Sequence, residues 1–548
     1  MKYTVHINIK NSFSMKKILL SFLVCLLGLQ TMGQDVDTLP YFRTDSMPDA
    51  GIYLPAPPDT CSPLFIDDFQ QWLWGKSMRS TPRGQQASWE SLYGVPRMCT
   101  VFSEALGFTI SKEATPAIYR LVSRARVTSA QAVDQAKAKY MRKRPFARMN
   151  EHVAGAFDNE EELRGNGSYP SGHTSLGWTT ALILAQMAPE QQDTILRRGW
   201  EYGESRVIVG AHWQSDVDAA RLAASACVAR LQESPEFQAD LAAARAEYLL
   251  WHGPTPTNVG FPNGSRILPP PIDTASFRYQ GDVAAHWLAK GERDSERGEQ
   301  AITDAASKVH HFLSQFSNCL NMQLDTTTAP HITAYLSYVR TALKNEANRL
   351  KDTYFRRRPY VQLAEPTLIP GEEESHVLTS SYPSSHSTFG WGLAMAMVEL
   401  TPDSMNSVLN RGFEYGHSRV IAGYHWATDV QAARLVAAYT LVRIQREPQF
   451  QTLLRNARAE YATLRGRTAV EPAPASDAIL TRVGQTVSLR FTDRPVKGRL
   501  NLYAVDGRLV RTADVDGNTT ISLANLPHGA YLVTFAGHEL FRNLKIVY

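Results

Sequence analysis

Apolar residues recur with a helical period through most of the chain. In residues 175–187 and 217–232 they fall at positions i, i+3, i+4 and i+7, which is the spacing of one helix face. The Ala-rich stretch 219–224 favours helix formation and close packing between helices. Runs of alternating β-branched residues do not occur before residue 480. The pattern predicts amphipathic helices that assemble into all-α bundles.

The pattern changes near Ile479 to short alternating segments, at 487–491, 500–503, 509–511, 521–523 and 531–535. Asp-Gly pairs at 506–507 and 516–517 and the sequence Pro-His-Gly at 527–529 supply turns between these segments. We expect a small β-sandwich of about 70 residues. Its sequence brings together no acids, histidines or aromatic platform, so we expect no catalytic role for it.

Comparison of the chain with itself, at an offset of 213 or 214 residues, finds two copies of one pattern. Residues 201–222 match residues 414–435 at most positions, and Asp68 recurs upstream as Asp282. The period is too long for a solenoid repeat, so each copy should be a whole domain with its own core. We expect two tandem helical-bundle domains, at 34–258 and 262–468, followed by the β-sandwich at 476–548. Pro- and Gly-rich connectors at 253–264 and 469–475 separate the domains.

The N-terminal segment has the pattern of a secretory signal peptide. Lys16 and Lys17 precede about a dozen apolar residues, and Thr31-Met32-Gly33 places small residues where a signal peptidase cuts. The apolar run is too short to span a bilayer, and Met15 is the expected start. We therefore expect residues 1–33 to be removed and the protein to be exported.

Removal of the signal peptide leaves four cysteines in an exported chain, namely Cys61, Cys99, Cys227 and Cys319. Disulfides persist outside the cytosol, but the sequence does not select among the three pairings, and free buried thiols remain an alternative. Their spacing disfavours zinc.

The net charge and the composition limit the kinds of partner that the chain is expected to bind. The 548 residues hold 57 Lys and Arg against 53 Asp and Glu, a net charge of +4, and 43% are hydrophobic. So small a charge favours neither nucleic acid nor an anionic membrane as the main partner. Beyond the signal peptide, no apolar run approaches the 18 or so residues of a transmembrane helix. Anion binding must therefore depend on a local cluster of cations and not on the net charge of the chain.

Three polar clusters occur in both copies, in the same order. In the first copy they are Lys137 with Arg144 and Pro145, then Pro170-Ser171-Gly172-His173, then Ser205, Arg206, His212 and Asp216. In the second copy they are Lys351 with Arg358 and Pro359, then Pro383-Ser384-Ser385-His386, then Ser418, Arg419, His425 and Asp429.

The first copy shows what each cluster offers. Lys137 and Arg144 are seven residues apart, so we expect both to project from one face of a single helix, although Arg142 and Lys143 beside them fit an ordinary solvated face. The Pro-Ser-Gly-His cluster precedes an apolar helical run, and a helix N-terminus favours a bound anion. His212 and Asp216 are four apart on one expected helix face, where the carboxylate can fix the imidazole tautomer. Arg206 reaches the same anion only if the chain turns.

Each cluster alone has a structural explanation as a solvated face, a helix cap or a packed histidine. Their conjunction does not, because two cations, a helix N-terminus, a third arginine and two histidines recur while the intervening residues differ. The sequence therefore predicts a site for a tetrahedral oxyanion in each copy.

The motifs Lys-x6-Arg-Pro, Pro-Ser-Gly-His and Ser-Arg-x5-His-x3-Asp resemble those of the type 2 phosphatidic-acid phosphatase superfamily. Residues 167–174 are similar to the hallmark of the bacterial class A non-specific acid phosphatases within it, as are the Pro-rich stretches 268–271 and, less completely, 54–58. The resemblance covers roughly residues 50–250 and 265–465, and its motif set is highly specific.

The resemblance implies a phosphomonoesterase that needs no metal and no cofactor and forms a phospho-histidine. In the first copy His212 would attack phosphorus, Asp216 would orient it and His173 would exchange protons with the leaving group and water. Lys137, Arg144, Ser171, the Gly172 N–H and Arg206 would hold the phosphate oxygens. In the second copy these roles fall to the corresponding residues His425, Asp429, His386, Lys351, Arg358, Ser384, the Ser385 N–H and Arg419.

The second copy has Ser385 where the first has Gly172. If this position requires a positive φ or a close approach of backbone to phosphate, the Cβ of serine is harmful, and at an ordinary first helical position it is harmless. We expect both sites to be active and the second to be impaired.

The β-sandwich resembles the C-terminal sorting domain of type IX secretion in Bacteroidetes-like bacteria, through residues 505–508, 526–532 and 545–548. This resemblance implies passage through the type IX machinery, loss of the module and a protein that is secreted or attached to the outer cell surface. A carbohydrate-binding or spacer domain is the alternative.

The leading function is an exported acid phosphatase acting on soluble phosphomonoesters. A vanadium-dependent haloperoxidase is an alternative, because that family resembles the same motifs. A surface protein that captures phosphorylated ligands without turnover is another. Since each copy holds a full set of residues, we expect two independent sites, in copies that pack as an intramolecular pseudo-dimer.

Overall fold

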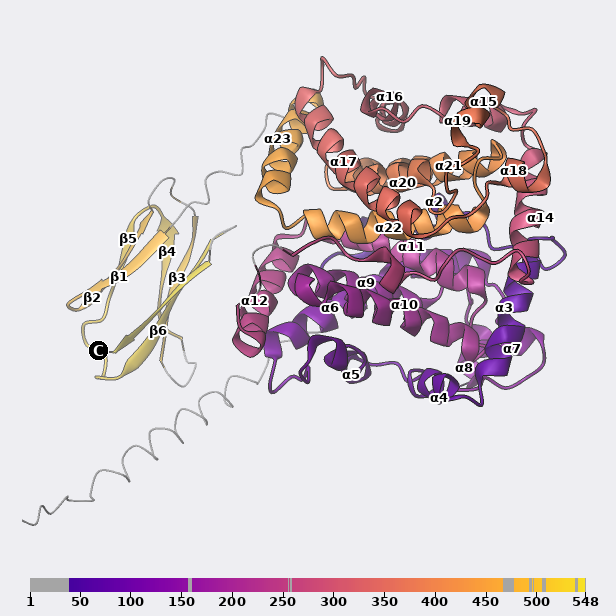
Figure 1. Ribbon diagram of the computed structural model, residues 1–548. Coiled ribbons are helices and arrows are strands. Elements are labelled where there is room, and N and C mark those ends of the chain that lie inside the picture. The colour runs from indigo at the N-terminus through magenta and orange to yellow at the C-terminus, as the bar shows by residue number, and fades with distance from the viewer. Residues whose placement is uncertain are drawn as a thin grey trace, which may run out of the picture. The chain divides into compact units, whose positions relative to one another are not determined.

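The structure is a computed structural model that describes residues 39–155, 160–254, 256, 259–466, 478–491, 495, 497–504, 509–537 and 541–547. The predicted signal peptide, the connector at 469–475 and the turn at 506–507 lie outside the described residues. The chain divides into two compact units, one up to Arg458 and one from Ala459 onward. The first unit is helical and the second consists mainly of strands (Figure 1).

The first copy forms a series of helices that ends at residue 252. They are η2 (Thr44–Ser46), α2 (Ala50–Tyr53), α3 (Phe65–Met78), α4 (Pro82–Trp89), α5 (Val95–Leu106), α6 (Pro116–Tyr140), α7 (Pro145–Arg148), α8 (Glu160–Gly165), α9 (Gly172–Met187), η3 (Pro189–Gln191), α10 (Gln192–Ile208), α11 (Gln214–Leu231) and α12 (Pro235–His252).

The second copy repeats the α-helices of the first one for one, from α13 in the place of α2 to α23 in the place of α12. They are α13 (Gly264–Ile267), α14 (Arg278–Lys290), α15 (Glu296–Thr303), α16 (Val309–Leu320), α17 (Pro330–Thr353), α18 (Pro359–Leu363), η4 (Pro370–Glu372), α19 (Glu373–His376), α20 (Ser385–Val398), η5 (Pro402–Ser404), α21 (Met405–Ile421), α22 (Ala427–Ile444) and α23 (Pro448–Leu464).

Local sequence explains many of the helix ends. The long helices α6 and α17 begin at Pro116 and Pro330, because proline has the φ of a first helical turn and needs no hydrogen-bond acceptor there. Helix α5 ends at Gly107 and α16 at Asn321, both in the left-handed conformation that glycine and asparagine adopt most easily.

The expectation of an amphipathic helix at 175–187 is wrong for α9. Every residue from Thr174 to Met187 is buried, and the same holds from Ser387 to Val398 in α20. Helix α9 packs against α6, α10, α11 and α12 of its own copy and against α22 of the other, so no face is left for solvent. These two central helices carry the Ser-Gly-His and Ser-Ser-His motifs at their N-termini.

The two copies pack on each other within the helical unit. Helix α2 of the first copy lies on α21 of the second, and α13 of the second lies on α10 of the first. The backbone N–H of Asp49 donates to Asn406 Oδ1 at 2.8 Å, and the N–H of Asn263 donates to Asp193 Oδ1 at 2.7 Å. Helix α2 also lies on α6 and α13 also lies on α17 of their own copies, so the two equivalent N-terminal arms bridge the copies.

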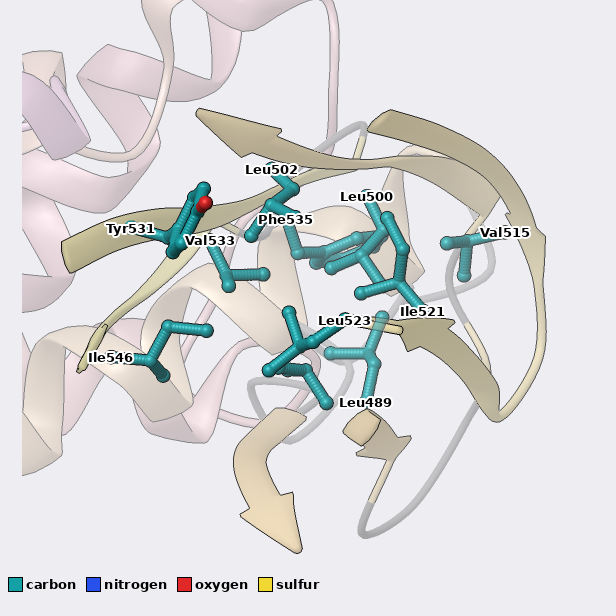
Figure 2. Packing of buried hydrophobic residues seen from close by; sticks show 11 residues of the cluster. Leu489, Leu500, Leu502, Val515, Ile521, Leu523, Tyr531, Val533, Phe535 and Ile546 are labelled. Carbon is teal, nitrogen blue, oxygen red and sulfur yellow. The ribbon is translucent and has the colours of Figure 1, made fainter. Parts of the chain in front are cut away.

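The C-terminal unit has two antiparallel sheets, as the alternating pattern predicts. One sheet has the order β1-β2-β5 and the other β4-β3-β6-β7. The strands are β1 (Ala478–Val483), β2 (Thr486–Phe491), β3 (Lys497–Ala504), β4 (Leu509–Asp516), β5 (Thr519–Ser522), β6 (Ala530–Gly537) and β7 (Phe541–Val547). Figure 2 shows the apolar side chains that both sheets contribute to one core, among them Leu489, Leu500 and Phe535.

The four cysteines left open by the sequence are all free thiols, with Cys99 and Cys227 buried and Cys61 exposed. Within the described ranges, the helices are too short or too polar for any of them to cross a bilayer.

Candidate active site

Each Pro-Ser-x-His motif opens a central helix, as predicted. Ser171 is the N-cap of α9, where its Oγ accepts from the backbone N–H of Thr174 at 3.3 Å. Ser384 caps α20 through Ser387 in the same way, also at 3.3 Å. The first backbone N–H groups of a helix have no partner inside it, so both motifs present donors to an anion.

The position that differs between the copies has ordinary helical geometry. Gly172 is the first residue of α9 and has no positive φ, and a Cβ built on it would meet Lys137 Cε at 3.8 Å, a normal contact. Ser385 is the first residue of α20. The geometry therefore gives no steric reason for Ser385 to impair the second site.

His212 lies just outside a helix, where the sequence had placed it on one. Trp213 is the N-cap of α11, and Asp216 in its first turn accepts from the Trp213 N–H at 2.8 Å through Oδ2. The same Oδ2 lies 3.5 Å from His212 Nδ1. The carboxylate thus caps the helix and faces the imidazole, and the predicted pairing forms without a shared helix face.

The closest partner of His212 Nδ1 is a backbone carbonyl that sequence reasoning missed. Nδ1 donates to Ser168 O at 2.8 Å, and because a carbonyl only accepts, this bond places the proton on Nδ1. Nε2 accepts from Arg144 Nη1 at 2.9 Å. Burial, reinforced by the charge of Arg144, lowers the pKa of His212 to about 3. The imidazole is therefore neutral, with the lone pair of Nε2 beside a guanidinium.

The residues that hold Asp216 also escaped the sequence interpretation, which left Arg142 as a solvated cation. Arg142 is largely buried; its Nη1 donates to Asp216 Oδ1 and its Nη2 to Asp68 Oδ2, both at 2.7 Å. Asp68 Oδ1 also accepts from the Ser215 N–H at 2.7 Å. Burial alone would raise the pKa of Asp216, but the charge of Arg142 holds it below its usual range. Both residues recur in the second copy, as Arg356 and Asp282, and this recurrence is the sequence signal that could have identified them.

Lys137 and Arg144 converge from two elements, and the expectation of a shared helix face is wrong. Helix α6 ends at Tyr140, and Arg144 is an extended residue before Pro145. Proline disfavours helical conformation in the residue before it, so the helix cannot continue through Arg144. In the second copy α17 ends at Thr353, ahead of Arg358.

Arg144 is buried and Lys137 is partly buried, and the two cations are near enough for the charge of one to act on the other. Arg144 donates to the backbone carbonyls of Leu163 and Ala211 at 2.9 and 3.0 Å, and Lys137 Nζ donates to Gly167 O at 2.8 Å. Burial, followed by the charge of Arg144, lowers the pKa of Lys137 to about 7.

The third arginine of each site is also buried. Arg206 Nη2 donates to Ser91 Oγ at 3.0 Å. Arg419 has Ala305 in the place of Ser91, and its guanidinium lies 4.9 Å from the ring centre of Tyr424. Among the described residues, Arg419 Nε and Nη1 have no hydrogen-bond partner. A buried guanidinium with unused donors favours an anionic ligand.

His173 completes the first cluster. Its Nε2 donates to Ser91 O at 3.1 Å, and burial together with the charge of Arg206 lowers its pKa well below the usual range. His386 makes the corresponding contact to Ala305 O at 2.8 Å.

The second copy repeats the other contacts. Arg358 Nη1 donates to His425 Nε2 at 3.1 Å, and His425 Nδ1 donates to Ser381 O at 2.8 Å and lies 3.8 Å from Asp429 Oδ2. Arg356 donates to both Asp429 and Asp282, each at 2.6 Å. Lys351 Nζ donates to Ser380 O at 2.7 Å. Each of these contacts joins two residues of the second copy. The part of the chain that the structure describes contains no group of three or more His, Cys, Asp or Glu suited to a metal ion.

Comparison with protein families matches residues 121–233 and 332–450 to the PAP2 superfamily. All sixteen candidate residues lie within these two ranges. A non-specific acid phosphatase of Providencia stuartii is 43% identical over 220 residues, which cover 39% of this chain and 88% of that protein. The chain belongs to the PAP2 superfamily.

Further relatives of this PAP2 protein are of the same kind. A non-specific acid phosphatase of Salmonella typhimurium is 37% identical over 232 residues, covering 42% of the chain and 92% of that enzyme. An acid phosphatase of Zymomonas mobilis is 34% identical over 207 residues, covering 38% of the chain and 76% of that enzyme. About two fifths of this chain is thus enough to cover most of each relative.

Proposed function

We propose that this acid phosphatase hydrolyses soluble phosphomonoesters at two sites per chain through a phospho-histidine intermediate. One observation carries the proposal: a buried, neutral histidine presents Nε2 to an arginine while a backbone carbonyl fixes the proton on Nδ1, and this arrangement occurs twice. A neutral imidazole is a nucleophile, and an adjacent guanidinium is the group best suited to hold a phosphate oxygen.

In the first step His212 Nε2 attacks phosphorus, the bond from phosphorus to the ester oxygen breaks, and His173 gives a proton to the departing alkoxide. The positive charge on the phosphorylated imidazole is stabilised by Asp216, which Arg142 and Asp68 hold in place. In the second step His173 takes a proton from water, the hydroxide attacks phosphorus and the bond to Nε2 breaks. Because the Nε2–H of His173 is held by the Ser91 carbonyl, the proton for the leaving group must be carried on Nδ1. His173 therefore has to gain this proton when the anionic phosphate of the substrate enters and offsets the neighbouring charge of Arg206.

The remaining groups stabilise charge on the transferred phosphoryl group. Lys137, Arg144, Arg206 and the N-terminus of α9 supply donors whose positions are fixed before substrate arrives, so little reorganisation is needed. Asp216 remains ionised at acidic pH, and the lowered pKa of His212 keeps the nucleophile unprotonated there. These two features support activity in acid.

The test uses the full chain with p-nitrophenyl phosphate. Hydrolysis should persist in EDTA and be inhibited by vanadate. It should remain in each of His212→Ala and His425→Ala and disappear in the double variant, whereas replacement of the exposed His152 by Ala should change nothing. A labelled substrate quenched in alkali should leave phosphate on the enzyme, since phospho-histidine survives base.

The two alternatives predict other results. Halide oxidation by peroxide with added vanadate, without hydrolysis, would identify a haloperoxidase. Stoichiometric phosphate binding without product would identify a capture protein, but the retained His-Asp pairs favour catalysis, because capture needs only the cations.

We also propose that the copies form an intramolecular pseudo-dimer with independent sites. The bridging α2 and α13 arms support the pairing. The site contacts described above, each within one copy, support the independence. Since Gly172 leaves room for a Cβ, we expect comparable kcat in the two sites. Single nucleophile variants of the full chain measure this without separating the arms from either copy.

Export is the last part of the proposal. We propose that residues 1–33 are removed as a signal peptide and that residues 476–548 act as a type IX sorting domain, leaving a secreted or surface-attached enzyme. Intact mass of secreted protein tests both cleavages, and a mature protein that retains residues 480–548 would refute the sorting role.

A further inference from the structure

A cavity of 390 Å³ lies between the two copies of the helical unit, apart from the groups that would hold phosphate. Residues of α3 and α11 line it from one side and residues of α14, α21 and α22 from the other. Most of the lining is apolar, including Leu64, Leu222, Leu288, Val420 and Leu435. Its size, its apolar lining and its place between two domains are typical of a small-molecule site.

The charged side chains in its lining are almost all paired. Three pairs lie within the lining, namely Asp67 with Arg278 at 3.0 Å, Asp218 with Arg221 at 3.1 Å and Glu292 with His417 at 3.1 Å. Asp68 and Asp282 pair with Arg142 at 2.7 Å and with Arg356 at 2.6 Å, respectively. Arg434 is the exception in this lining.

Arg434 is a buried cation, only 4% exposed, without an acid. Its Nη2 donates to Phe413 O at 2.9 Å and its guanidinium lies 3.8 Å from the ring centre of Phe413. Within the described part of the chain, Nε has no hydrogen-bond partner and no carboxylate pairs with this side chain. Burial alone lowers the pKa of Arg434 to about 9, so it remains charged at neutral pH.

The first copy shows what is missing. Arg221 occupies the equivalent place, and Asp218 and Glu204 both favour its charged form. Their counterparts near Arg434 are Gln431 and His417, neither of which is an acid. The second copy has thus kept the buried arginine and lost both of its acids. An uncompensated buried charge is unfavourable, and a bound anion would compensate it.

We infer that the cavity binds a small amphipathic anion, an aliphatic carboxylate whose head pairs with Arg434 and whose hydrocarbon lies along the apolar walls. A guanidinium and a carboxylate form a bidentate, charge-assisted pair. The apolar walls favour a hydrocarbon body over a free inorganic anion. The inference does not depend on the hydrolytic mechanism, because none of its residues belongs to the phosphate-binding groups.

Calorimetric titration of the full chain with sodium octanoate tests the inference, in saturating inorganic phosphate so that the active sites are occupied. Octanoate should bind saturably with one equivalent per chain. Octanol, which lacks the charge, should bind roughly ten- to hundredfold more weakly, the loss expected for one charge-assisted bond. Acetate keeps the carboxylate but lacks six methylene groups of the hydrocarbon, so it should bind more than roughly a hundredfold more weakly.

The most informative variant introduces into the second copy an acid that the first copy has. Gln431→Asp restores the acid of Asp218, so it should raise the melting temperature and weaken octanoate binding at least tenfold. Gln431→Asn is the neutral control and should bind as the unmodified chain does. Absence of saturable octanoate binding to the unmodified chain, or equal binding by folded Gln431→Asp, would overturn the inference. Since heat is measured and not hydrolysis, failure of the catalytic proposal would leave this result unaffected.

Discussion

Replacement of Arg142 tests whether the nucleophile depends on the chain of contacts behind it. Arg142 makes one hydrogen bond of 2.7 Å to Asp216 and one of 2.7 Å to Asp68, and all three side chains are largely or fully buried. Charge-assisted bonds contribute about 1.5–3 kcal/mol each. Removal of one partner of a buried ion pair costs about 3–5 kcal/mol. Arg142→Gln should therefore lower the free energy of unfolding by about that amount.

Activity should fall for a separate reason. If Asp216 loses one charge-assisted bond that stabilises the transition state, about 1.5–3 kcal/mol corresponds to a kcat lower by roughly ten- to a hundredfold. KM should change little, because the groups that hold phosphate are untouched. The measurement uses p-nitrophenyl phosphate in a His425→Ala background, so that only the first site reports.

The pH dependence of kcat distinguishes the effect of the Arg142 charge from the effect of its hydrogen-bond geometry. The charge of Arg142 holds the pKa of Asp216 below its usual range, so the ionised form persists in acid and is lost only as pH falls through that low value. Arg142→Gln removes the charge, raises the pKa of Asp216 and moves the acid limb of the kcat profile to higher pH. Arg142→Lys keeps the charge, so its acid limb should stay while kcat falls.

The exposed neighbour Lys143 supplies the control, and Lys143→Gln should match the parent in kcat, acid limb and melting temperature. A folded Arg142→Gln variant with the kcat and the acid limb of its parent would refute the reasoning.

Three further results are expected. The pKa of Lys137 near 7 means that kcat/KM should decline as pH rises through 7 and the lysine loses its charge, and Lys137→Arg should remove this limb from the first site. Ser91→Ala removes the hydroxyl that Arg206 donates to, so KM of the first site should change by roughly fivefold or less while kcat is kept. A Cβ at Gly84 would lie 2.3 Å from a backbone carbonyl oxygen, so Gly84→Ala should destabilise the fold by about 1–3 kcal/mol in denaturant titration, whereas Gly165→Ala, with open space, should not.

The sequence predicted the parts of the site that depend on local patterns. Ser171 lies at a helix N-terminus because a capping residue precedes an apolar run, and that signal is contained in a few consecutive residues. The internal repeat identified the other candidate residues, because these residues recur in both copies while their neighbours differ. The helical bundles and the two-sheet module followed from hydrophobic periodicity together with the Ala-rich stretch and the turn-forming pairs.

The parts that escaped prediction depend on contacts between distant segments. Ser168 supplies a backbone carbonyl to His212, 44 residues away, and a carbonyl leaves no trace in the side-chain sequence. Arg142 looked like a surface cation because its two acids are 74 residues away on either side. The shared helix face expected for Lys137 and Arg144 ignored the effect of Pro145 on the residue before it.

The arms that bridge the two copies affect the order in which the chain can fold during synthesis. Asp49 is among the first described residues, and its partner Asn406 is 357 residues further along. At an elongation rate of about 5–20 residues per second, this separation corresponds to roughly 20–70 s of synthesis. During that interval α2 can pack on α6 of its own copy, but its second partner, α21, has not yet been made, whereas α10 is complete before α13 is synthesised. The first copy is therefore expected to gain its last packing contacts only after most of the second copy has been synthesised.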